Sequence, residues 1–340
     1  MEKGPNNKMS FSLVICTYKR ALPLLKLLHS VKEQSLYPDE ILIIDGSPDE
    51  TTAVMLRENL FKDLSYHKVT PEHRGLTKQR NYGIAKVAAT SEIVCFLDDD
   101  TVLEGNYFEE IINTYQLYPE ALGVGGYITN EVNWTQVERN YAPKNHEFYY
   151  DGFKRNEGSR FVWRKKLGLD SNCPPGFLPA FSHGRSISFL PPSGKVYEVE
   201  QLMGGVSSFR KDVFDSLQFS TYFEGYGLYE DADFTLRLSK QGKLFVNTSA
   251  RLGHFHAPSG RPNQYHYGKM VVRNGWYVWR VKYPNPSLKA QLKWHAITLL
   301  LTFIRMSNVF TKSDRKKALT ETLGRLSGWG SLLFYKPQEQ

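Results

Sequence analysis

Three consecutive aspartates, Asp98 to Asp100, follow directly on an apolar run over residues 92–97. Adjacent carboxylates repel one another, so this placement is costly unless a cation neutralises them. A hard divalent ion such as Mg²⁺ or Mn²⁺ takes oxygen ligands and bridges to the oxygens of a diphosphate. The run therefore predicts a metal-assisted diphosphate site. The alternative is a solvated acidic loop in which Asp100 caps the next helix.

A second acidic group lies at the start of a helix predicted over residues 230–241. Glu230, Asp231 and Asp233 all fall in its first turn. Acids there complement the positive end of the helix dipole, which is one explanation for their presence. The other explanation is that one of them faces a cleft and acts as a general base. The residues alone leave both explanations open.

Two histidines, His254 and His256, come after a strand predicted over residues 243–247. Alternate residues of an extended segment point to the same side, so the two imidazoles are expected to share a face. Either could complete a metal site begun by Asp100, because divalent metals accept both imidazole and carboxylate ligands. A lone histidine is more often a core or surface residue, but a pair near an acidic cluster favours the metal site.

Other polar and small residues stand next to predicted elements. Asp45 ends an apolar run and begins the turn sequence Asp-Gly-Ser-Pro, and its carboxylate could also accept hydrogen bonds from a nucleobase or a ribose. Arg80 lies near the start of a predicted helix, where it suits a phosphate, although a surface arginine is the commoner case. Gly204 and Gly205 precede a short strand and let the backbone approach a ligand.

Short apolar runs alternate with helical patterns over the first 130 residues. The expected strands are residues 11–16, 40–45, 64–69 and 92–97. The expected helices are residues 22–31, 77–89 and 104–118. This alternation predicts an α/β fold with a mainly parallel sheet covered by helices. Ligands bind at the carboxyl ends of such strands, which is where the segment from Thr17 to Arg20, Asp45 and the three aspartates stand.

The rest of the chain has a different character. Residues 130–192 are rich in Tyr, Asn, Gly and Pro, and we expect a partly ordered insertion there. Beyond residue 263 the pattern is mostly helical, with an apolar stripe at Leu292, Ala296, Leu299, Phe303, Met306 and Phe310. Residues 289–340 hold nine basic and three acidic residues. This tail could rest on an anionic membrane surface or pack its apolar face on the preceding domain.

Composition excludes several classes of protein. The chain has 340 residues, of which 41% are hydrophobic, so wholesale disorder is excluded. Cys16, Cys95 and Cys173 are too few and too scattered for a disulfide framework or a zinc site. The apolar run at residues 294–304 is shorter than the roughly 20 residues of a membrane span, and no signal peptide is expected. Basic charge gathers in the tail instead of lining an aromatic groove, so no nucleic-acid partner is expected.

Seven short motifs, in order, resemble those of the family 2 glycosyltransferases, which are inverting enzymes with a GT-A fold. The motifs are CTYKR, IIDGS, GLTKQRNYGI, FLDDDT, MGGVSSFRKDVF, EGYGLYEDADFTLRL and GHFH. The resemblance covers residues 11–256. It implies a GT-A catalytic domain, Rossmann-like and specific for nucleoside-diphosphate sugars, at residues 9–260 with the insertion at 130–192. Residues 261–340 would form a basic, amphipathic helical extension.

The resemblance also implies roles for individual residues on the nucleotide side. Thr17, Tyr18 and Arg20 would line the nucleotide, and Asp45 would contact its base. Arg80 matches the nucleotide-side arginine of the third motif. Lys19 departs from the family pattern, which often has a small polar residue at this position.

The remaining implied roles concern the metal, the sugar and the acceptor. In the DXD motif FLDDDT, Asp98 or Asp99 would contact the ribose and Asp100 would bind the metal. Gly204 and Gly205 would border the donor sugar and the acceptor. Asp231 matches the catalytic base, beside Glu230. His254 matches the family's later histidine better than His256 does, although the doublet leaves the choice of metal ligand open.

The implied reaction is a single displacement that inverts the anomeric carbon. Asp231 would take the proton of the acceptor hydroxyl, while Mn²⁺ or Mg²⁺ on Asp100 would stabilise the leaving nucleoside diphosphate. The expected donor is a nucleoside-diphosphate sugar, with UDP as the first choice of nucleotide. The expected acceptor is a glycan or a lipid-linked hydroxyl in cell-surface polysaccharide assembly. The protein would be cytoplasmic, with peripheral contact at the inner face of an anionic membrane.

Two alternatives to this function have different requirements. A sugar nucleotidyltransferase shares a related sheet, but it needs a glycine-rich basic loop after the first strand, and CTYKRALP has none. A catalytically weak carbohydrate-binding protein on the GT-A fold would have no need to keep costly acids such as Asp98 to Asp100 and Asp231.

Overall fold

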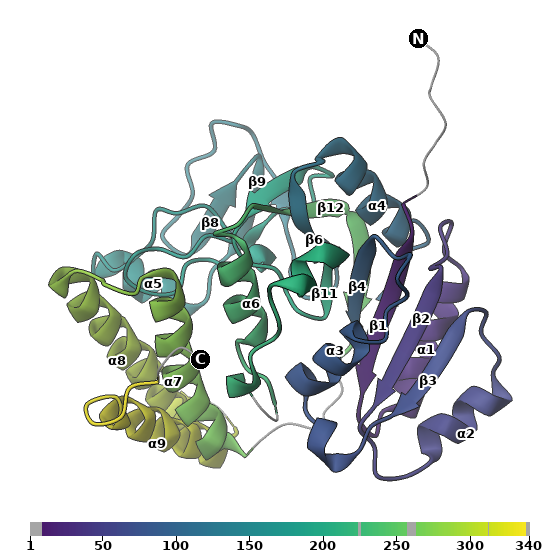
Figure 1. Cartoon of the computed structure of the whole chain (residues 1–340). Helices are drawn as coiled ribbons and strands as arrows, with labels where there is room; N and C mark the ends of the chain where they lie inside the picture. The colour runs from purple at the N-terminus through teal and green to yellow at the C-terminus, as the bar shows by residue number, and fades with distance from the viewer. Residues whose placement is uncertain (1–8, 224–225, 257–262, 312, 338–340) are drawn as a thin grey trace.

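A mixed sheet forms the centre of the computed structural model, which describes residues 9–223, 226–256, 263–311 and 313–337 (Figure 1). Within these residues the sheet has nine strands in the order β10-β12-β6-β11-β4-β1-β2-β3, and β5 pairs with β12. The boundary that the sequence predicts at residues 260/261 falls outside the described residues, as does Lys312 of the basic tail.

The first half of the sheet is parallel, as the alternating pattern predicts. Its strands are β1 (Phe11–Thr17), β2 (Glu40–Asp45), β3 (Leu64–Lys68) and β4 (Ile93–Asp98). Its helices are α1 (Ala21–Lys32), α2 (Thr51–Glu58), α3 (Leu76–Ile84) and α4 (Tyr107–Leu117). β1 pairs in parallel with β2 and β4, so Thr17, Asp45 and Asp98 end neighbouring strands at one edge of the sheet.

In the second half of the sheet, one strand is antiparallel to both of its neighbours. Its elements are β5 (Thr101–Leu103), β6 (Ala121–Ile128), β10 (Val196–Val199), β11 (Val206–Arg210), α6 (Glu230–Leu238) and β12 (Lys243–His254). β11 lies between β4 and β6 and is antiparallel to both. β12 pairs in parallel with β6 and antiparallel with β5, which brings His254 opposite Thr101.

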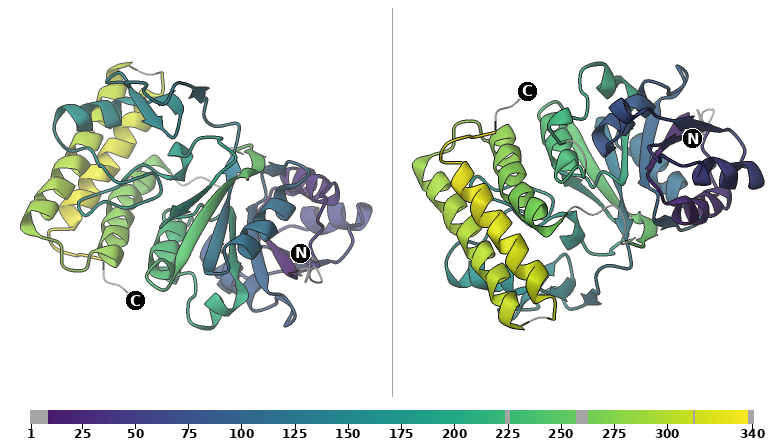
Figure 2. Two further views of the ribbon diagram at one scale, coloured as in Figure 1. Left: turned by 90° about the horizontal axis from the view of Figure 1, so that it is seen from above. Right: turned by 90° about the horizontal axis from the view of Figure 1, so that it is seen from below.

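Helices cover both faces of the sheet, and each face has its own apolar core (Figure 2). On one face α1 and α4 bury residues such as Leu27 and Phe108. On the other face α6 contributes Phe234 and Leu238. Burial of this apolar surface is the main driving force for folding, and it fixes the strand ends that carry the polar residues.

The insertion is ordered, and the tail packs on it and on α6. A small sheet in the order β7-β9-β8 and a helix α5 form within the insertion. The bounds are β7 (Thr135–Gln136), β8 (Glu147–Tyr150), β9 (Phe153–Asn156) and α5 (Ser159–Lys166). The tail consists of α7 (Gln264–Lys282), α8 (Leu288–Thr311) and α9 (Arg315–Ser331). A third core joins Leu236 of α6 to Trp276, Trp279 and Trp294 of the tail.

The apolar stripe predicted for the tail points outward. Phe303 is 58% exposed and Phe310 80%, whereas Trp294 and Ile297 of the same helix are buried. Packing of that stripe on the preceding domain is therefore wrong, because α8 uses a different face for its core contacts. Among the described residues, no helix combines the length and apolar character that a membrane crossing requires.

Several predicted boundaries are also wrong. The helix expected over residues 77–89 ends at Ile84, and the N–H of Ala88 donates instead to the Glu40 carboxylate at 3.1 Å. The strand expected over residues 243–247 continues to His254 through a register shift, because β6 and β5 supply further partners. The helix α2 and the strands β5, β6 and β10 were not expected from the sequence.

Candidate active site

The three aspartates lie at the end of β4, beside the loop that follows β1. The Thr17 hydroxyl donates a hydrogen bond to Asp99 at 2.7 Å. The Arg20 guanidinium bridges Asp99 at 3.1 Å and Asp100 at 3.2 Å. Asp99 and Asp100 are buried, while the Asp98 side chain is 39% exposed. Two chain segments thus converge on the acids, and Asp98 is the carboxylate most open to solvent.

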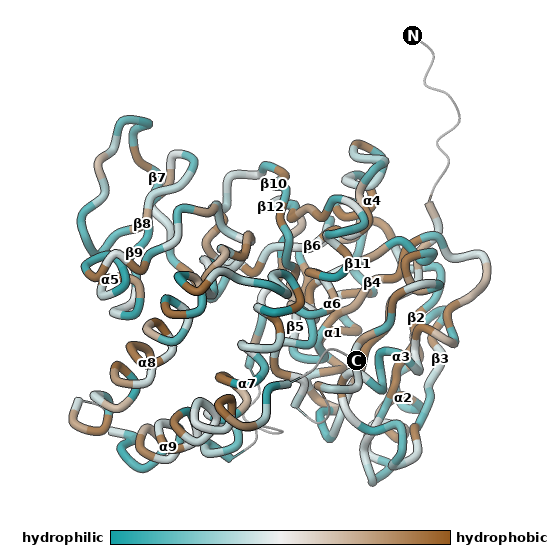
Figure 3. Tube along the Cα trace, turned by 60° about the vertical axis from the view of Figure 1, so that its left-hand side comes forward, coloured by the Kyte–Doolittle hydropathy of each residue, from teal (hydrophilic) through white to brown (hydrophobic). Residues whose placement is uncertain are grey.

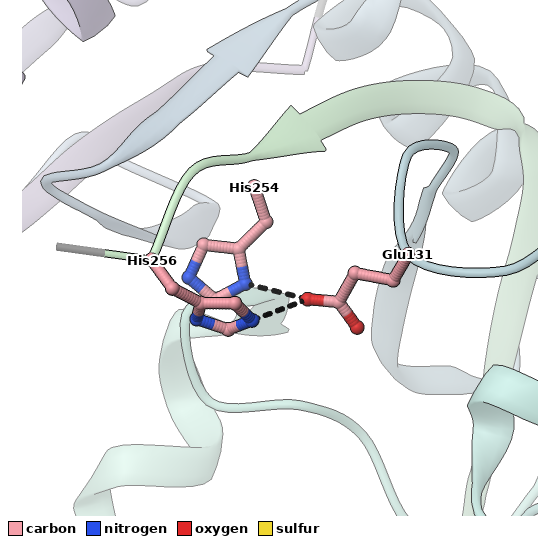
Figure 4. A group of neighbouring side chains, drawn as sticks. All are labelled: Glu131, His254 and His256. Atoms are coloured by element: carbon pink, nitrogen blue, oxygen red, sulfur yellow. Dashed lines mark ion pairs between the residues drawn. The ribbon is translucent and has the colours of Figure 1, made fainter. Parts of the chain in front are cut away.

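The histidine pair meets the aspartates through His254. Its Nε2 lies 3.1 Å from Asp100 and 4.0 Å from Asp98. Its Nδ1 lies 3.3 Å from Glu131, a residue at the start of the insertion, and His256 contacts the same carboxylate at 2.8 Å (Figure 4). The two imidazoles share a face, as expected, and only His254 is close to the aspartates.

The acids and the imidazole perturb one another. Burial would lower the pKa of His254, but hydrogen bonds to Asp100 and Glu131 and the charge of Asp98 raise it to about 10. Burial raises the pKa of Asp99 to about 6, against the opposing effects of Arg20 and Thr17. The raised pKa values of His254 and Asp99 reflect carboxylates crowded at this position, an arrangement that favours a bound cation.

The donor set at this position suits a divalent metal. Asp98, Asp100 and His254 each offer one ligand atom, and these atoms lie within 4.8 Å of one another. Glu131, His254 and His256 form a second group of the same kind. Two carboxylates and one imidazole match the ligand preferences of Mn²⁺, and the carboxylates also suit Mg²⁺.

A buried arginine connects these acids to the helix that carries the predicted base. Arg80 of α3 is 3% exposed and lies 2.5 Å from Glu230 and 3.7 Å from Asp98. Its guanidinium lies over the Phe219 ring, with 5.1 Å to the ring centroid. The charges of Glu230 and Asp98 raise its pKa against the effect of burial. Arg80 is therefore an internal link between α6 and the end of β4 and not a surface residue.

The glycine pair makes room for that link. A Cβ on Gly204 would lie 2.6 Å from an Arg80 nitrogen, and a Cβ on Gly205 would lie 2.0 Å from the Asp98 carboxyl carbon. Real Cβ atoms do not approach that closely, so only glycine fits at either position without movement of these charged groups. The glycines precede β11, which places them beside β4.

Asp231 lies at the start of α6, next to the glycine pair. One carboxylate oxygen accepts a hydrogen bond from the Gly204 N–H at 3.2 Å, and the other accepts from the Ala232 N–H at 2.7 Å. Burial raises the pKa of Asp231 above its ordinary value, against both of these bonds. Burial and the adjacent Asp231 charge also raise the pKa of Glu230 to about 8, against the opposing effect of Arg80. Acids with raised pKa values suit a proton acceptor.

Asp45 is placed differently from the other acids. Its side chain is completely buried, and its two oxygens accept hydrogen bonds from the Ser47 N–H at 2.7 Å and the Tyr66 hydroxyl at 3.0 Å. This is the turn arrangement that the sequence allowed as one explanation. Contact with a nucleobase stays a prediction.

The loop after β1 presents Tyr18 and Lys19 at the same edge of the sheet. Tyr18 is 44% exposed. Lys19 has φ +55°, the left-handed region in which residues without a bulky side chain are less strained. The family pattern of a small polar residue at this position therefore has a backbone explanation.

The structure thus brings together most of the residues that the sequence singled out, and it adds three others. Glu131, Tyr66 and Phe219 contact His254, Asp45 and Arg80, respectively. Each of the three comes from a segment without a recognisable motif. The contacts made by Tyr66, Phe219 and Glu131 form only when distant segments pack together, so the local sequence pattern does not predict them.

Comparison with solved structures identifies the fold of the chain. The chain is similar to the crystal structure of GalNAc-T7 with UDP, GalNAc and Mn²⁺, with a TM-score of 0.53 and 18% identity over 81% of this chain and 49% of that one. This likeness concerns the fold, which is the GT-A fold with flanking helices and a helical C-terminal region.

A sequence comparison supports the family resemblance over the first half of the chain. Residues 12–173 match the family described as Glycosyl transferase family 2. The matched residues contain the first four of the seven motifs that indicated this resemblance.

Curated relatives carry glycosyltransferase names. A glucosyl-dolichyl phosphate glucuronosyltransferase of Haloferax volcanii is 29% identical over 145 residues, which is 42% of this chain and 44% of that protein. The O-antigen chain rhamnosyltransferase RfbN of Salmonella typhimurium is 32% identical over 96 residues, 28% of this chain and 29% of that protein. The chain spans less than half the length of these relatives.

Proposed function

We propose that this protein transfers a sugar from a nucleoside-diphosphate sugar to a hydroxyl group with inversion at the anomeric carbon. The single observation that carries the proposal is the convergence of Asp98, Asp100 and His254 with the pair Glu230 and Asp231 through buried Arg80. A cation-binding acid cluster and a separate acid of raised pKa are the two parts that such a displacement needs.

The donor side of the proposed site is the edge formed by the loop after β1 and the end of β4. Tyr18 is exposed there for contact with the nucleotide, and Thr17 and Arg20 orient the carboxylates of Asp99 and Asp100. Asp100 and His254, with Asp98, would hold Mn²⁺ or Mg²⁺, and the bound metal would supply charge stabilisation for the departing diphosphate. UDP is the proposed nucleotide, in line with the UDP and Mn²⁺ in the GalNAc-T7 structure.

On the acceptor side, Asp231 takes the proton of the incoming hydroxyl. The two backbone N–H groups that bond its oxygens hold the carboxylate in place beside the glycine pair. Glu230 does not take this role, because its carboxylate is engaged by Arg80 at 2.5 Å. Arg80 and Glu230 are therefore positioning residues for Asp231.

The proposed acceptor is a glycan or a lipid-linked hydroxyl, in cell-surface polysaccharide assembly. The names of the Haloferax and Salmonella relatives, with a dolichyl phosphate and an O-antigen chain, support this choice. We assign the transfer reaction to residues 9–260 and the approach to the acceptor to the helical extension at 261–340.

The extension also offers a surface for an anionic membrane. Phe303 and Phe310 of α8 and Leu323 of α9 are at least half exposed, and Figure 3 shows apolar residues along both helices. The exposed basic residues Lys289, Arg315, Lys316 and Lys317 stand at the ends of the same helices. Apolar side chains between basic ends suit the interface of a bilayer with anionic headgroups.

Flotation with lipid vesicles tests this contact. The protein should float with vesicles that contain anionic lipid at low salt, and less at moderate salt. Replacement of Phe303 and Phe310 by serine should reduce flotation, whereas Leu60→Ser, at an 88% exposed position of the catalytic domain, should not. Equal flotation of all three proteins would overturn the assignment of this face.

A thermal-shift screen of nucleoside diphosphates with and without Mn²⁺ tests the central proposal. UDP with Mn²⁺ should raise the melting temperature, because a ligand of the folded state stabilises it in proportion to its occupancy. The shift should be lost in Asp100→Asn and retained in Asp231→Asn. Absence of a metal-dependent shift with every nucleotide would contradict the proposed donor site.

A further inference from the structure

A cavity of about 410 Å³ lies outside the acid cluster, between the insertion and the helices of the tail. Its wall contains five arginines, which are Arg160, Arg164, Arg185, Arg305 and Arg325. They come from α5, the segment after it, α8 and α9, so four separate parts of the chain direct cationic side chains toward one space.

Three of these arginines have acidic partners in the described structure. Arg185 pairs with Glu157 at 2.7 Å and Asp170 at 2.8 Å. Arg305 and Arg325 share one acid, Glu321, which lies 2.8 Å from Arg305 and 2.7 Å from Arg325. Among the described residues, three carboxylates therefore pair with three of the five arginines, and Glu157 is also paired with Lys165.

Among the described residues, the remaining two arginines have no carboxylate at ion-pair distance. Arg164 is 3% exposed, and its guanidinium donates to the backbone carbonyls of Leu169 and His183 at 3.1 and 2.9 Å. Arg160 also has no carboxylate at ion-pair distance within the described part of the chain, but it is exposed, and its guanidinium lies over the Phe161 ring, 4.7 Å from the centroid. A buried guanidinium without a paired carboxylate is costly, and an anionic ligand beside Arg164 would reduce that cost.

The shifted pKa values of groups at the cavity indicate a positive electrostatic potential there. Burial lowers the pKa of Arg164 to about 10 against the opposing charge of Asp170, and the nearby Arg185 and Arg160 contribute to the decrease. Burial and the charges of Arg164 and Arg160 lower the pKa of His183 to about 4. The cavity is therefore a region of positive potential in which a neutral imidazole is preferred.

The other part of the wall is apolar. Val272 of α7 and Trp294, Ile297, Leu301 and Ile304 of α8 line it. Planar guanidinium groups bind phosphate oxygens through paired hydrogen bonds, and an apolar wall binds hydrocarbon. The two halves together fit a phosphate ester that is attached to an apolar chain.

The cavity adjoins the predicted base. Tyr229 forms part of its wall and directly precedes Glu230 and Asp231. The Tyr229 ring stacks on His183, with 5.5 Å between the ring centroids, and its φ of +73° is a strained backbone conformation. Because consecutive Cα atoms are about 3.8 Å apart, the Cα atoms of Tyr229 and Asp231 are within roughly 7 Å of one another.

We propose that this cavity binds the phosphate or diphosphate group through which the acceptor is joined to an apolar carrier. The inference rests on the proposed transfer reaction and names the part of the acceptor that is recognised. Arg160 and Arg164 contact the phosphate, the α7 and α8 residues contact the first part of the carrier chain, and the attached sugar extends past Tyr229 toward Asp231.

The test is a titration of the full-length protein with farnesyl phosphate, in EDTA, followed by tryptophan fluorescence because Trp294 lines the cavity. Without a divalent ion the aspartates at β4 repel phosphate, so the signal reports the cavity. Farnesyl phosphate should bind at least tenfold more tightly than farnesol and than inorganic phosphate. Equal binding of farnesol would overturn the phosphate contact, and equal binding of inorganic phosphate would overturn the apolar carrier.

Variants assign the binding to the arginines. Arg160→Gln should weaken farnesyl phosphate about 10- to 100-fold, the effect of removing one charged hydrogen-bond donor. Arg139→Gln, an exposed arginine of the same insertion away from the cavity, is the matched control and should bind as the wild type does. Arg325→Gln is a second probe from another helix. Unchanged affinity in both cavity variants would overturn the proposal.

The result is independent of the proposed transfer reaction. The titration needs neither nucleotide nor metal, and Arg160→Gln should keep the thermal shift with UDP and Mn²⁺. Loss of that shift in the wild type would count against the transfer reaction alone, whereas loss of farnesyl phosphate binding with an intact shift counts against the cavity alone.

Discussion

Replacement of Asp231 by asparagine separates catalysis from binding. The substitution keeps the shape of the side chain but leaves one acceptor oxygen for two backbone donors, the Gly204 N–H at 3.2 Å and the Ala232 N–H at 2.7 Å. The loss of one hydrogen bond to a charged group costs about 1.5–3 kcal/mol of stability. Domains have unfolding free energies of about 5–15 kcal/mol, so the variant should remain folded.

Its turnover should fall much further than its stability suggests. A general base contributes a factor of about 10² to 10⁴, equivalent to about 3–5 kcal/mol in the activation barrier. Affinity for UDP should stay within about twofold, because Thr17, Tyr18, Arg20 and Asp100, the proposed contacts of the nucleotide and metal, are unchanged.

The assay is the release of UDP from a panel of UDP-sugars in the presence of Mn²⁺, with UDP affinity measured by calorimetry. Glu230→Gln is the informative companion, since it weakens the hydrogen bond with buried Arg80 and should cost about 1–3 kcal/mol of stability. A loss of turnover below tenfold in Asp231→Asn, or loss of its UDP binding, would refute the assignment of Asp231 as the base.

Three further predictions concern the scaffold. Gly205→Ala should lower stability in urea denaturation by at least about 1–3 kcal/mol and abolish the UDP–Mn²⁺ thermal shift, because the new Cβ would lie 2.0 Å from the Asp98 carboxyl carbon. Gly330→Ala, whose new Cβ would have nothing within 4 Å, should be neutral or stabilising in the same measurement. His183, whose pKa is lowered to about 4, stays neutral while the unfolded chain takes up a proton near 6.5. The unfolding free energy should therefore fall by up to about 3 kcal/mol as the pH drops from 6.5 to 4. The fall should be smaller in His183→Gln, and parallel pH profiles of wild type and variant would contradict this prediction. Lys19→Gly should gain up to about 1 kcal/mol because φ is +55°, and Lys19→Val should lose at least that much in thermal unfolding; the reverse order would exclude backbone strain at this position.

The strand ends were predictable from the sequence because each follows a continuous apolar run. β2 begins and ends where its pattern indicated, and Thr17 and Asp98 each fall one residue beyond the predicted end of their strand. Parallel pairing then brings these ends together without any information about side chains. The residues of the candidate site that lie on this edge were therefore accessible from local pattern and topology.

Other features depend on packing that local patterns do not contain. β6 holds Gly123, Gly125 and Gly126, which argue against a strand by propensity, but a Cβ on Gly126 would lie 2.5 Å from the Tyr107 ring. Glu131 carries no motif and meets His254 only after the insertion folds. The spacing of Phe303 and Phe310 predicted a shared face of α8, but not that the face is exposed.

The position of β11 bears on how the chain can be divided in the laboratory. The segment that matches the family, residues 12–173, contains β4 and β6 but neither β11, which joins them, nor α6, which covers them. A fragment with those limits would lack the strand between β4 and β6, and Arg80 would lose its partner Glu230. The limits of recognisable similarity are therefore not limits of an autonomous folding unit, and expression of a minimal domain should extend at least through His254.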